Sequence, residues 1–201
     1  MDKKALIVLS KTNIDLKKFE FDMIIGVESG CISIIDQGLE LNHSISDFDH
    51  VEPNDLERIK KMSHNHIQLN KEKDVIDGWA SAELAIKNGA DFIKFIFTNN
   101  NRIDMIFSII DLLRNFNCEF ESENSRVYFI KNSVTLNFND HKQYRYVSIL
   151  LLSDSNLKIK GLRYETDRYF KKFTSQLISN SFNKCDGHIE CDREFVIILN
   201  K

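Results

Sequence analysis

The fold is decided by residues 77–97, which read DGWASAELAIKNGADFIKFIF. Apolar residues at helical spacing follow Asp77, and Asn88-Gly89 is a natural C-terminal stop for a helix. After this stop, residues 92–97 form a strongly apolar run that is typical of a buried strand. The stretch therefore predicts a helix that is followed at once by a buried strand.

The same alternation extends on both sides of this stretch. Short runs rich in Ile and Val, bounded by polar residues, alternate with segments of helical spacing. We predict strands at residues 5–9, 23–27, 43–46 and 66–69, and helices at residues 31–37, 53–62 and 103–116. This order favours an α/β fold, a parallel sheet with helices on its faces.

The pattern changes after about residue 117. Short β-type runs separated by polar turns occupy the rest of the chain, and residues 166–173 fit either a strand or a helix. The β-type runs are residues 126–131, 134–138, 146–152, 157–159 and 195–199. We therefore expect two domains, an α/β domain at 1–117 and a C-terminal all-β sandwich at 118–201.

Composition excludes several classes of protein. Hydrophobic residues make up 42% of the chain, which is enough for a proper core. The formal charge is −3, so the chain has no general basic field for nucleic acid. No apolar run is long enough to span a membrane or to form a signal peptide, and we expect a cytoplasmic protein.

The four cysteines are Cys31, Cys118, Cys185 and Cys191. Cys185 and Cys191 flank a Gly-His pair, as in a metal knuckle, but their spacing fits no common zinc pattern. Reduced structural thiols are the better interpretation for a cytosolic protein.

Acidic pairs follow two of the predicted strands. Asp47 and Asp49 come directly after residues 43–46, and Asp74 and Asp77 come after residues 66–69. Parallel sheets bind ligands outside the carboxyl ends of their strands. Asp74 and Asp77 are three residues apart, so one turn of helix would aim both carboxylates the same way. Gathered carboxylates require a cation, and Mg²⁺ prefers oxygen ligands and bridges to phosphates.

A third polar segment, residues 99–104, lies between a predicted strand and a predicted helix. Backbone amides at a helix start favour an anion, and Arg102 can fork onto a phosphate. Structural roles also fit these motifs. Asp-x-Asp is common in turns, Asp77 suits a helix N-cap, and Asp104 suits the first turn of a helix.

In this order, the motifs resemble those of the thiamine pyrophosphokinases. That family carries an Asp-Gly-Gly-like turn, Gly-Asp-Phe-Asp-Ser, Lys-Asp-x-x-Asp and Gly-Gly-Arg-x-Asp-His, and the segments here are 28–30, 46–50, 73–77 and 100–105. The C-terminal half resembles the family's β domain, where residues 179–182 are similar to a Ser-Asn-x-aromatic segment. The departures are Glu28 for an aspartate, Ser46, Asn100 and Asn101 for glycines, His50 for a serine and Met105 for a histidine.

The resemblance implies transfer of a diphosphoryl group from ATP to the hydroxyl of thiamine, which gives thiamine diphosphate and AMP. It also implies a homodimer with thiamine between the subunits. Asp47, Asp49, Asp74 and Asp77 would hold Mg²⁺ and orient the reacting groups. Asn100, Asn101, Arg102 and Asp104 would bind the nucleotide, and Glu28, Ser179, Asn180 and Phe182 would bind the substrate.

Two alternatives stay open. The same diphosphoryl transfer can serve another hydroxyl acceptor, such as a hydroxymethylpterin. A protein of this sequence can also sense thiamine or a nucleotide without turnover, and the loss of the motif glycines favours that interpretation.

Overall fold

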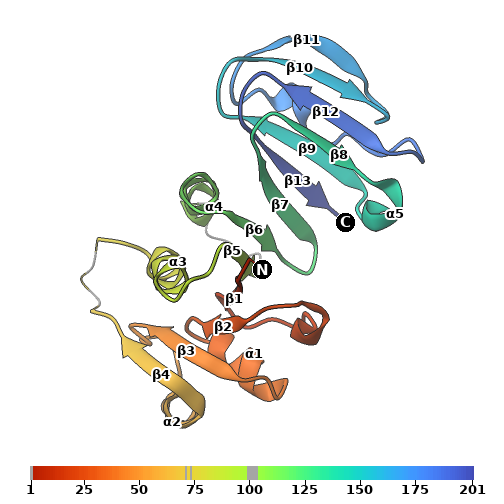
Figure 1. Ribbon diagram of the computed structural model, residues 1–201. Coiled ribbons are helices and arrows are strands. Elements are labelled where there is room, and N and C mark those ends of the chain that lie inside the picture. Colours follow the sequence, from red (N-terminus) through yellow and green to blue (C-terminus); the bar gives the residue numbers. More distant parts are fainter. Residues whose placement is uncertain (1, 71, 73, 99–103) are drawn as a thin grey trace. The chain divides into compact units, whose positions relative to one another are not determined.

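A computed structural model describes residues 2–70, 72, 74–98 and 104–201 (Figure 1). The chain divides into two compact units, Met1–Glu123 and Asn124–Lys201. Among the described residues, no helix is long and apolar enough to cross a membrane.

The first unit is built on a parallel sheet with the strand order β4-β3-β2-β1-β5-β6. Its strands are β1 (Lys4–Val8), β2 (Met23–Gly26), β3 (Leu41–Ser46), β4 (Ser63–Gln68), β5 (Phe92–Ile96) and β6 (Cys118–Glu121). Its helices are η1 (Leu16–Lys18), α1 (Gly30–Asp36), α2 (Pro53–Met62), α3 (Asp77–Lys87) and α4 (Asp104–Asn115). The predicted alternation of strands and helices is confirmed.

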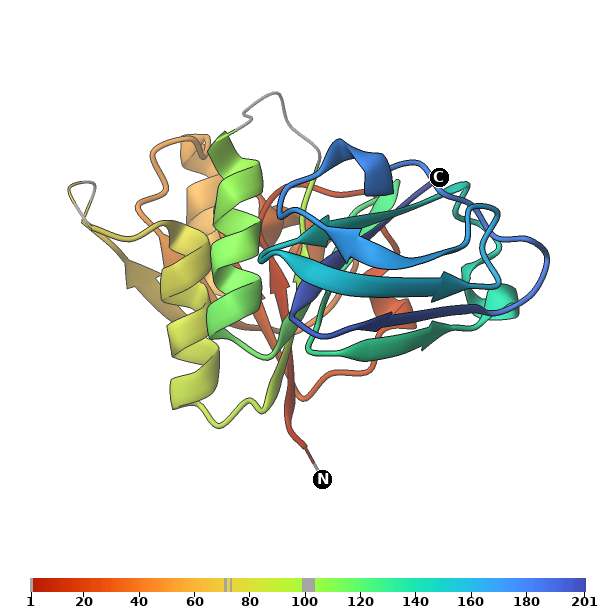
Figure 2. The same cartoon turned by 90° about the horizontal axis from the view of Figure 1, so that it is seen from above.

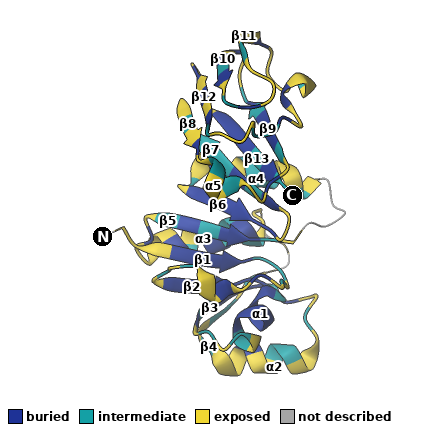
Figure 3. Ribbon diagram, turned by 90° about the vertical axis from the view of Figure 1, so that its right-hand side faces the viewer, coloured by how far each residue is buried: buried dark blue, intermediate teal, exposed yellow. Residues whose placement is uncertain are grey.

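Helices cover both faces of this sheet. Leu6, Val8 and Ile24 pack in one buried cluster with α1 and α2. On the other face α3 and α4 run side by side (Figures 1 and 2). The ring of Trp79, in α3, packs edge to face on the ring of Phe116, directly after α4, with the ring centroids 5.0 Å apart. The central strands are buried along most of their length (Figure 3), as expected for a parallel sheet that is covered on both sides.

The second unit is a sandwich of two antiparallel sheets. β13 pairs with β7 and β9, and the other sheet has the order β11-β10-β12-β8. One buried cluster takes side chains from both sheets, which makes it the core of a sandwich. The elements are β7 (Ser125–Ile130), β8 (Ser133–Leu136), α5 (Phe138–His141), β9 (Tyr146–Leu151), β10 (Ser155–Lys160), β11 (Thr166–Phe170), η2 (Ser175–Leu177), β12 (Gly187–Cys191) and β13 (Phe195–Asn200). The predicted fold class is confirmed.

Several details of the structure differ from the prediction or complete it. β6 and β12 were not predicted, and the ambiguous segment forms the strand β11. Because β6 pairs in parallel with β5, residues 118–121 lie in the first unit and the division falls after Glu123.

Cys185 is exposed and Cys191 is buried, and both are free thiols.

Candidate functional site

A cluster of carboxylates lies at the carboxyl ends of β2 and β3. Glu28 follows β2, and Asp47 and Asp49 follow β3, which is the parallel neighbour of β2. One oxygen from each of these three residues lies within 4.8 Å of the others. Neighbouring parallel strands end at the same edge of a sheet, so this topology brings together residues that are about twenty positions apart.

Left-handed backbone shapes the cluster. Glu28 has φ 49° and Phe48 has φ 56°, a region that costs free energy for residues other than glycine. The Phe48 ring is buried, and its centroid lies 4.8 Å from the centroid of the His66 ring. This contact anchors the turn. The flanking Asp47 is half-buried and Asp49 is exposed. The core contact of Phe48 therefore fixes the turn that carries the two aspartates.

Glu28 lies at the centre of this arrangement. Its Oε1 accepts a hydrogen bond of 3.0 Å from the Phe48 N–H and is also hydrogen-bonded to the Ser46 hydroxyl. Glu28 Oε2 is buried, and no residue in the described part of the chain hydrogen-bonds to it. Burial raises the pKa of Glu28, the Ser46 hydrogen bond opposes that rise, and the neighbouring Asp47 and Asp77 add to it.

The start of α1 explains the glycine of the first motif. A Cβ atom built on Gly30 would lie 2.1 Å from the Val8 backbone oxygen, so no other residue fits there without displacing β1. Gly30 thus lets α1 approach β1 closely enough to place Glu28 beside Asp47.

The other predicted metal ligands lie differently. α3 begins at Asp77, so the expectation that one helical turn carries both Asp74 and Asp77 is wrong. Asp77 is half-buried and accepts a hydrogen bond of 2.8 Å from the Ser46 hydroxyl, whereas Asp74 is exposed and precedes the helix. Asp104 begins α4. The predicted nucleotide ligands Asn100, Asn101 and Arg102 lie outside the described residues.

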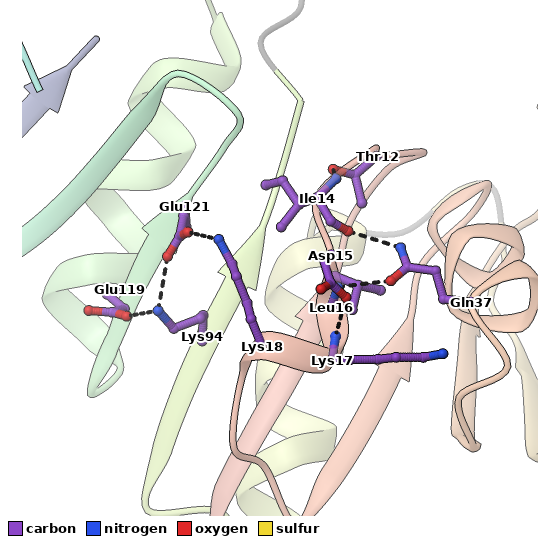
Figure 4. Close-up of polar contacts among 10 residues, drawn as sticks. All are labelled: Thr12, Ile14, Asp15, Leu16, Lys17, Lys18, Gln37, Lys94, Glu119 and Glu121. Carbon is purple, nitrogen blue, oxygen red and sulfur yellow. Dashed lines mark hydrogen bonds and ion pairs between the residues drawn. The ribbon is translucent and has the colours of Figure 1, made fainter. Parts of the chain in front are cut away.

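Side chains at the two ends of α1 hydrogen-bond to the backbone of the segment that follows β1. The Lys11 N–H donates to Ser29 Oγ at 3.2 Å. Gln37 clamps the same segment further along, because its amide accepts from the Leu16 N–H at 2.8 Å and donates to the Ile14 oxygen at 2.9 Å (Figure 4). α1 therefore positions this segment as well as Glu28.

A second charged network lies on β5 and β6 (Figure 4). Lys94 pairs with Glu119 and, at 3.1 Å, with Glu121, and Lys18 pairs with Glu121 at 2.9 Å. Burial raises the pKa of Glu121, but hydrogen bonds and charge from the two lysines outweigh it and hold that pKa below its ordinary value. A cavity of about 380 Å³ lies beside this network, and none of its described lining residues belongs to the carboxylate cluster. Within the network, the two lysines balance the charges of the two glutamates.

The predicted substrate residues of the second unit lie on one turn. Ser179 has φ 60°, and its N–H donates to Ser148 Oγ at 3.1 Å. Asn180 is buried, and its main chain forms an isolated antiparallel β-bridge with Val147. Phe182 is half-buried and bridges to Leu162.

The Asn180 side chain holds a neighbouring loop. Its Oδ1 accepts from the N–H groups of Tyr164 and Ser181, each at 2.9 Å, and its Nδ2 donates to the Tyr164 oxygen at 2.8 Å. Sequence reasoning missed this role, and it also missed the bridge that Ser46 makes between Glu28 and Asp77. The only sequence signal for either was the position of the residue within a recognised motif.

Residues 133–196 match the family model described as thiamin pyrophosphokinase, vitamin B1 binding domain. No curated protein matches the chain. The solved structures that resemble the chain include a thiamine pyrophosphokinase from Bacillus subtilis, which is 20% identical over 99% of both chains with a TM-score of 0.86. A thiamin pyrophosphokinase family protein from Enterococcus faecalis is 17% identical over 100% of this chain and 99% of its own, with a TM-score of 0.81.

A fungal structure shows the same similarity. Thiamin pyrophosphokinase from Candida albicans is 17% identical over 99% of this chain and 89% of its own, with a TM-score of 0.72. At these identities the similarity establishes the fold. Together with the match over residues 133–196, it confirms the resemblance of the chain to the thiamine pyrophosphokinase family.

Proposed function

We propose that this protein transfers a diphosphoryl group from ATP to the hydroxyl of thiamine, giving thiamine diphosphate and AMP. The observation that carries the proposal is the match of residues 133–196 to a vitamin B1 binding domain. The fold supports it, since proteins named thiamine pyrophosphokinases share it along nearly the whole chain. The carboxylate cluster of the first unit supports the proposal further, because enzymes that transfer phosphoryl groups from ATP hold Mg²⁺ with acidic side chains.

The cluster fits a magnesium ion. Its three candidate ligands, Glu28, Asp47 and Asp49, are carboxylates, which Mg²⁺ prefers. Within the described ranges, Glu28 Oε2 is buried without a hydrogen-bond partner, and such an atom costs free energy until something binds it. Bound there, Mg²⁺ would neutralise negative charge on the triphosphate.

The reaction has a simple balance. The hydroxyl oxygen of thiamine forms a bond to the β-phosphorus of ATP, and the bond from that phosphorus to the oxygen bridging to the α-phosphorus breaks. AMP leaves with the bridging oxygen, and the hydroxyl proton passes to a carboxylate of the cluster. The task of the protein is mainly to align the two substrates and to balance charge.

The remaining assignments follow from the sequence resemblance. Asp74 and Asp77 serve the magnesium side, Asn100, Asn101, Arg102 and Asp104 bind ATP, and Ser179, Asn180 and Phe182 bind thiamine. The proposal includes a homodimer with thiamine between its subunits and a cytoplasmic location.

The test incubates purified protein with ATP, Mg²⁺ and thiamine, and separates the products by chromatography. We expect AMP and thiamine diphosphate in equal amounts. Asp47→Asn should lower the rate by at least about a hundredfold. Asp111→Asn is the control, because Asp111 is an exposed carboxylate on α4 outside the cluster. AMP released only with a pterin acceptor, or thiamine bound without AMP release, would contradict the proposal in favour of one of the two alternatives.

A further inference from the structure

Ser46 links two carboxyl groups that come from different elements. It is the last residue of β3 and is fully buried. Its hydroxyl is hydrogen-bonded to Oε1 of Glu28, which follows β2, and at 2.8 Å to Oδ2 of Asp77, which begins α3. A single hydroxyl therefore connects three separate segments of the first unit.

This contact decides which oxygen of Glu28 is left for a cation. Oε1 of Glu28 is engaged by the Ser46 hydroxyl and by the Phe48 N–H. Oε2 is buried and has no hydrogen-bond partner among the described residues. A hydroxyl has one hydrogen, which it donates to one carboxylate, and two lone pairs, so it joins two carboxyl groups at the same time when the second is protonated and donates to the hydroxyl oxygen.

We propose that Ser46 is a positioning residue, which holds the Glu28 carboxylate with Oε2 available to a divalent cation and couples Asp77 to the same site. The inference rests on the proposed function, because the cation is the one that diphosphoryl transfer requires. Groups that hydrogen-bond to metal-ligating carboxylates orient them, and their removal typically weakens metal binding about 10- to 100-fold.

β3 supplies a matched control. Ser44 lies two residues earlier, on the same face of the strand, and is also fully buried. Its hydroxyl contacts His66 Nδ1 at 2.9 Å rather than a carboxylate. Ser44→Ala and Ser46→Ala therefore remove the same atom from equally buried positions, and only the second change removes a contact to the cluster.

The experiment measures Mn²⁺ binding by electron paramagnetic resonance of the free ion, without nucleotide and without turnover. We expect Ser46→Ala to raise the Mn²⁺ dissociation constant about tenfold. Ser44→Ala should stay within about twofold of wild type, since its hydroxyl lies outside the cluster. A Ser46→Ala constant equal to that of wild type, an equal effect of both alanine variants, or absence of Mn²⁺ binding to wild type would overturn the inference.

Two further comparisons separate positioning from packing. Ser46→Thr and Ser46→Val add side chains of the same shape, and only threonine keeps the hydroxyl. Threonine should bind Mn²⁺ about tenfold more tightly than valine, and equal constants would overturn the inference. In a Glu28→Gln background, Ser46→Ala should change the constant by less than about twofold, because Ser46 acts through Glu28. Full additivity of the two changes would also overturn it.

The product assay keeps the two claims apart. If wild type forms no thiamine diphosphate but the Mn²⁺ comparisons hold, the proposed function fails and the role of Ser46 stands. If wild type forms the product and Ser46→Ala binds Mn²⁺ normally, the proposed function stands and the role of Ser46 fails.

Discussion

Asn180→Ala tests whether the turn at residues 179–182 is held by the Asn180 side-chain amide. The change removes three hydrogen bonds, two to the backbone of Tyr164 and one from the Ser181 N–H. A hydrogen bond contributes about 1 kcal/mol net, so the full loss would be about 3 kcal/mol. Tyr164 is exposed, and water can replace part of what its backbone loses. We therefore expect a loss of about 2–3 kcal/mol in the free energy of unfolding.

Urea unfolding followed by circular dichroism measures this loss. With a slope of about 1–2 kcal/mol per molar urea, the midpoint should fall by roughly 1–3 M. Asn183→Ala is the control, because Asn183 is exposed on the same segment, and its midpoint should stay close to that of wild type. If Asn180→Ala keeps the wild-type midpoint, its side-chain amide does not hold the turn and the structural reasoning is refuted.

Three further changes probe the first unit. Glu121→Gln should lower the free energy of unfolding at pH 7 by about 1–2 kcal/mol, because Glu121 pairs with Lys18 and Lys94. The lowered pKa of Glu121 means that this contribution is present above pH 4.5 and is lost as the pH falls through the folded-state pKa. Burial lowers the pKa of His43, so wild type should lose stability as the pH falls below 6.5, and His43→Gln should lose less. Gly30→Ala should cost about 3 kcal/mol or more, because its Cβ meets the Val8 oxygen.

Each of these outcomes has a clear contrary. Equal unfolding free energies of Glu121→Gln and wild type at pH 7, from urea titrations, would show that the lysine pairs add nothing. Parallel pH profiles of His43→Gln and wild type between pH 7 and 5 would remove His43 as a source of acid sensitivity. A Gly30→Ala protein with the wild-type melting temperature would show that α1 does not need its close approach to β1.

The sequence predicted the elements whose burial follows a simple period. Residues 77–97 form the expected helix and strand, because apolar spacing and the Asn88-Gly89 stop agree with each other. β6 was missed, since its Glu119 and Glu121 look like surface residues and are buried only because Lys94 pairs with both. Such pairing across strands carries no local pattern.

The site was predicted in part for the same reason. Asp47 and Asp49 form a local motif after a strand, and the structure places them together with Glu28. The position of Glu28 in this cluster depends on the parallel pairing of β2 with β3 and on the left-handed backbone at Glu28 itself. The role of Ser46 depends on the positions of α3 and β2 relative to β3, which residue types along the chain do not specify.

The most direct test of diphosphoryl transfer follows the phosphorus atoms. Wild-type protein is incubated with Mg²⁺, thiamine and ATP that carries ³²P only at the β-phosphate. We expect the label to move into thiamine diphosphate, with none in AMP and none in ADP. Label that stays in ATP, or that appears in ADP beside unlabelled thiamine monophosphate, would contradict the proposed reaction.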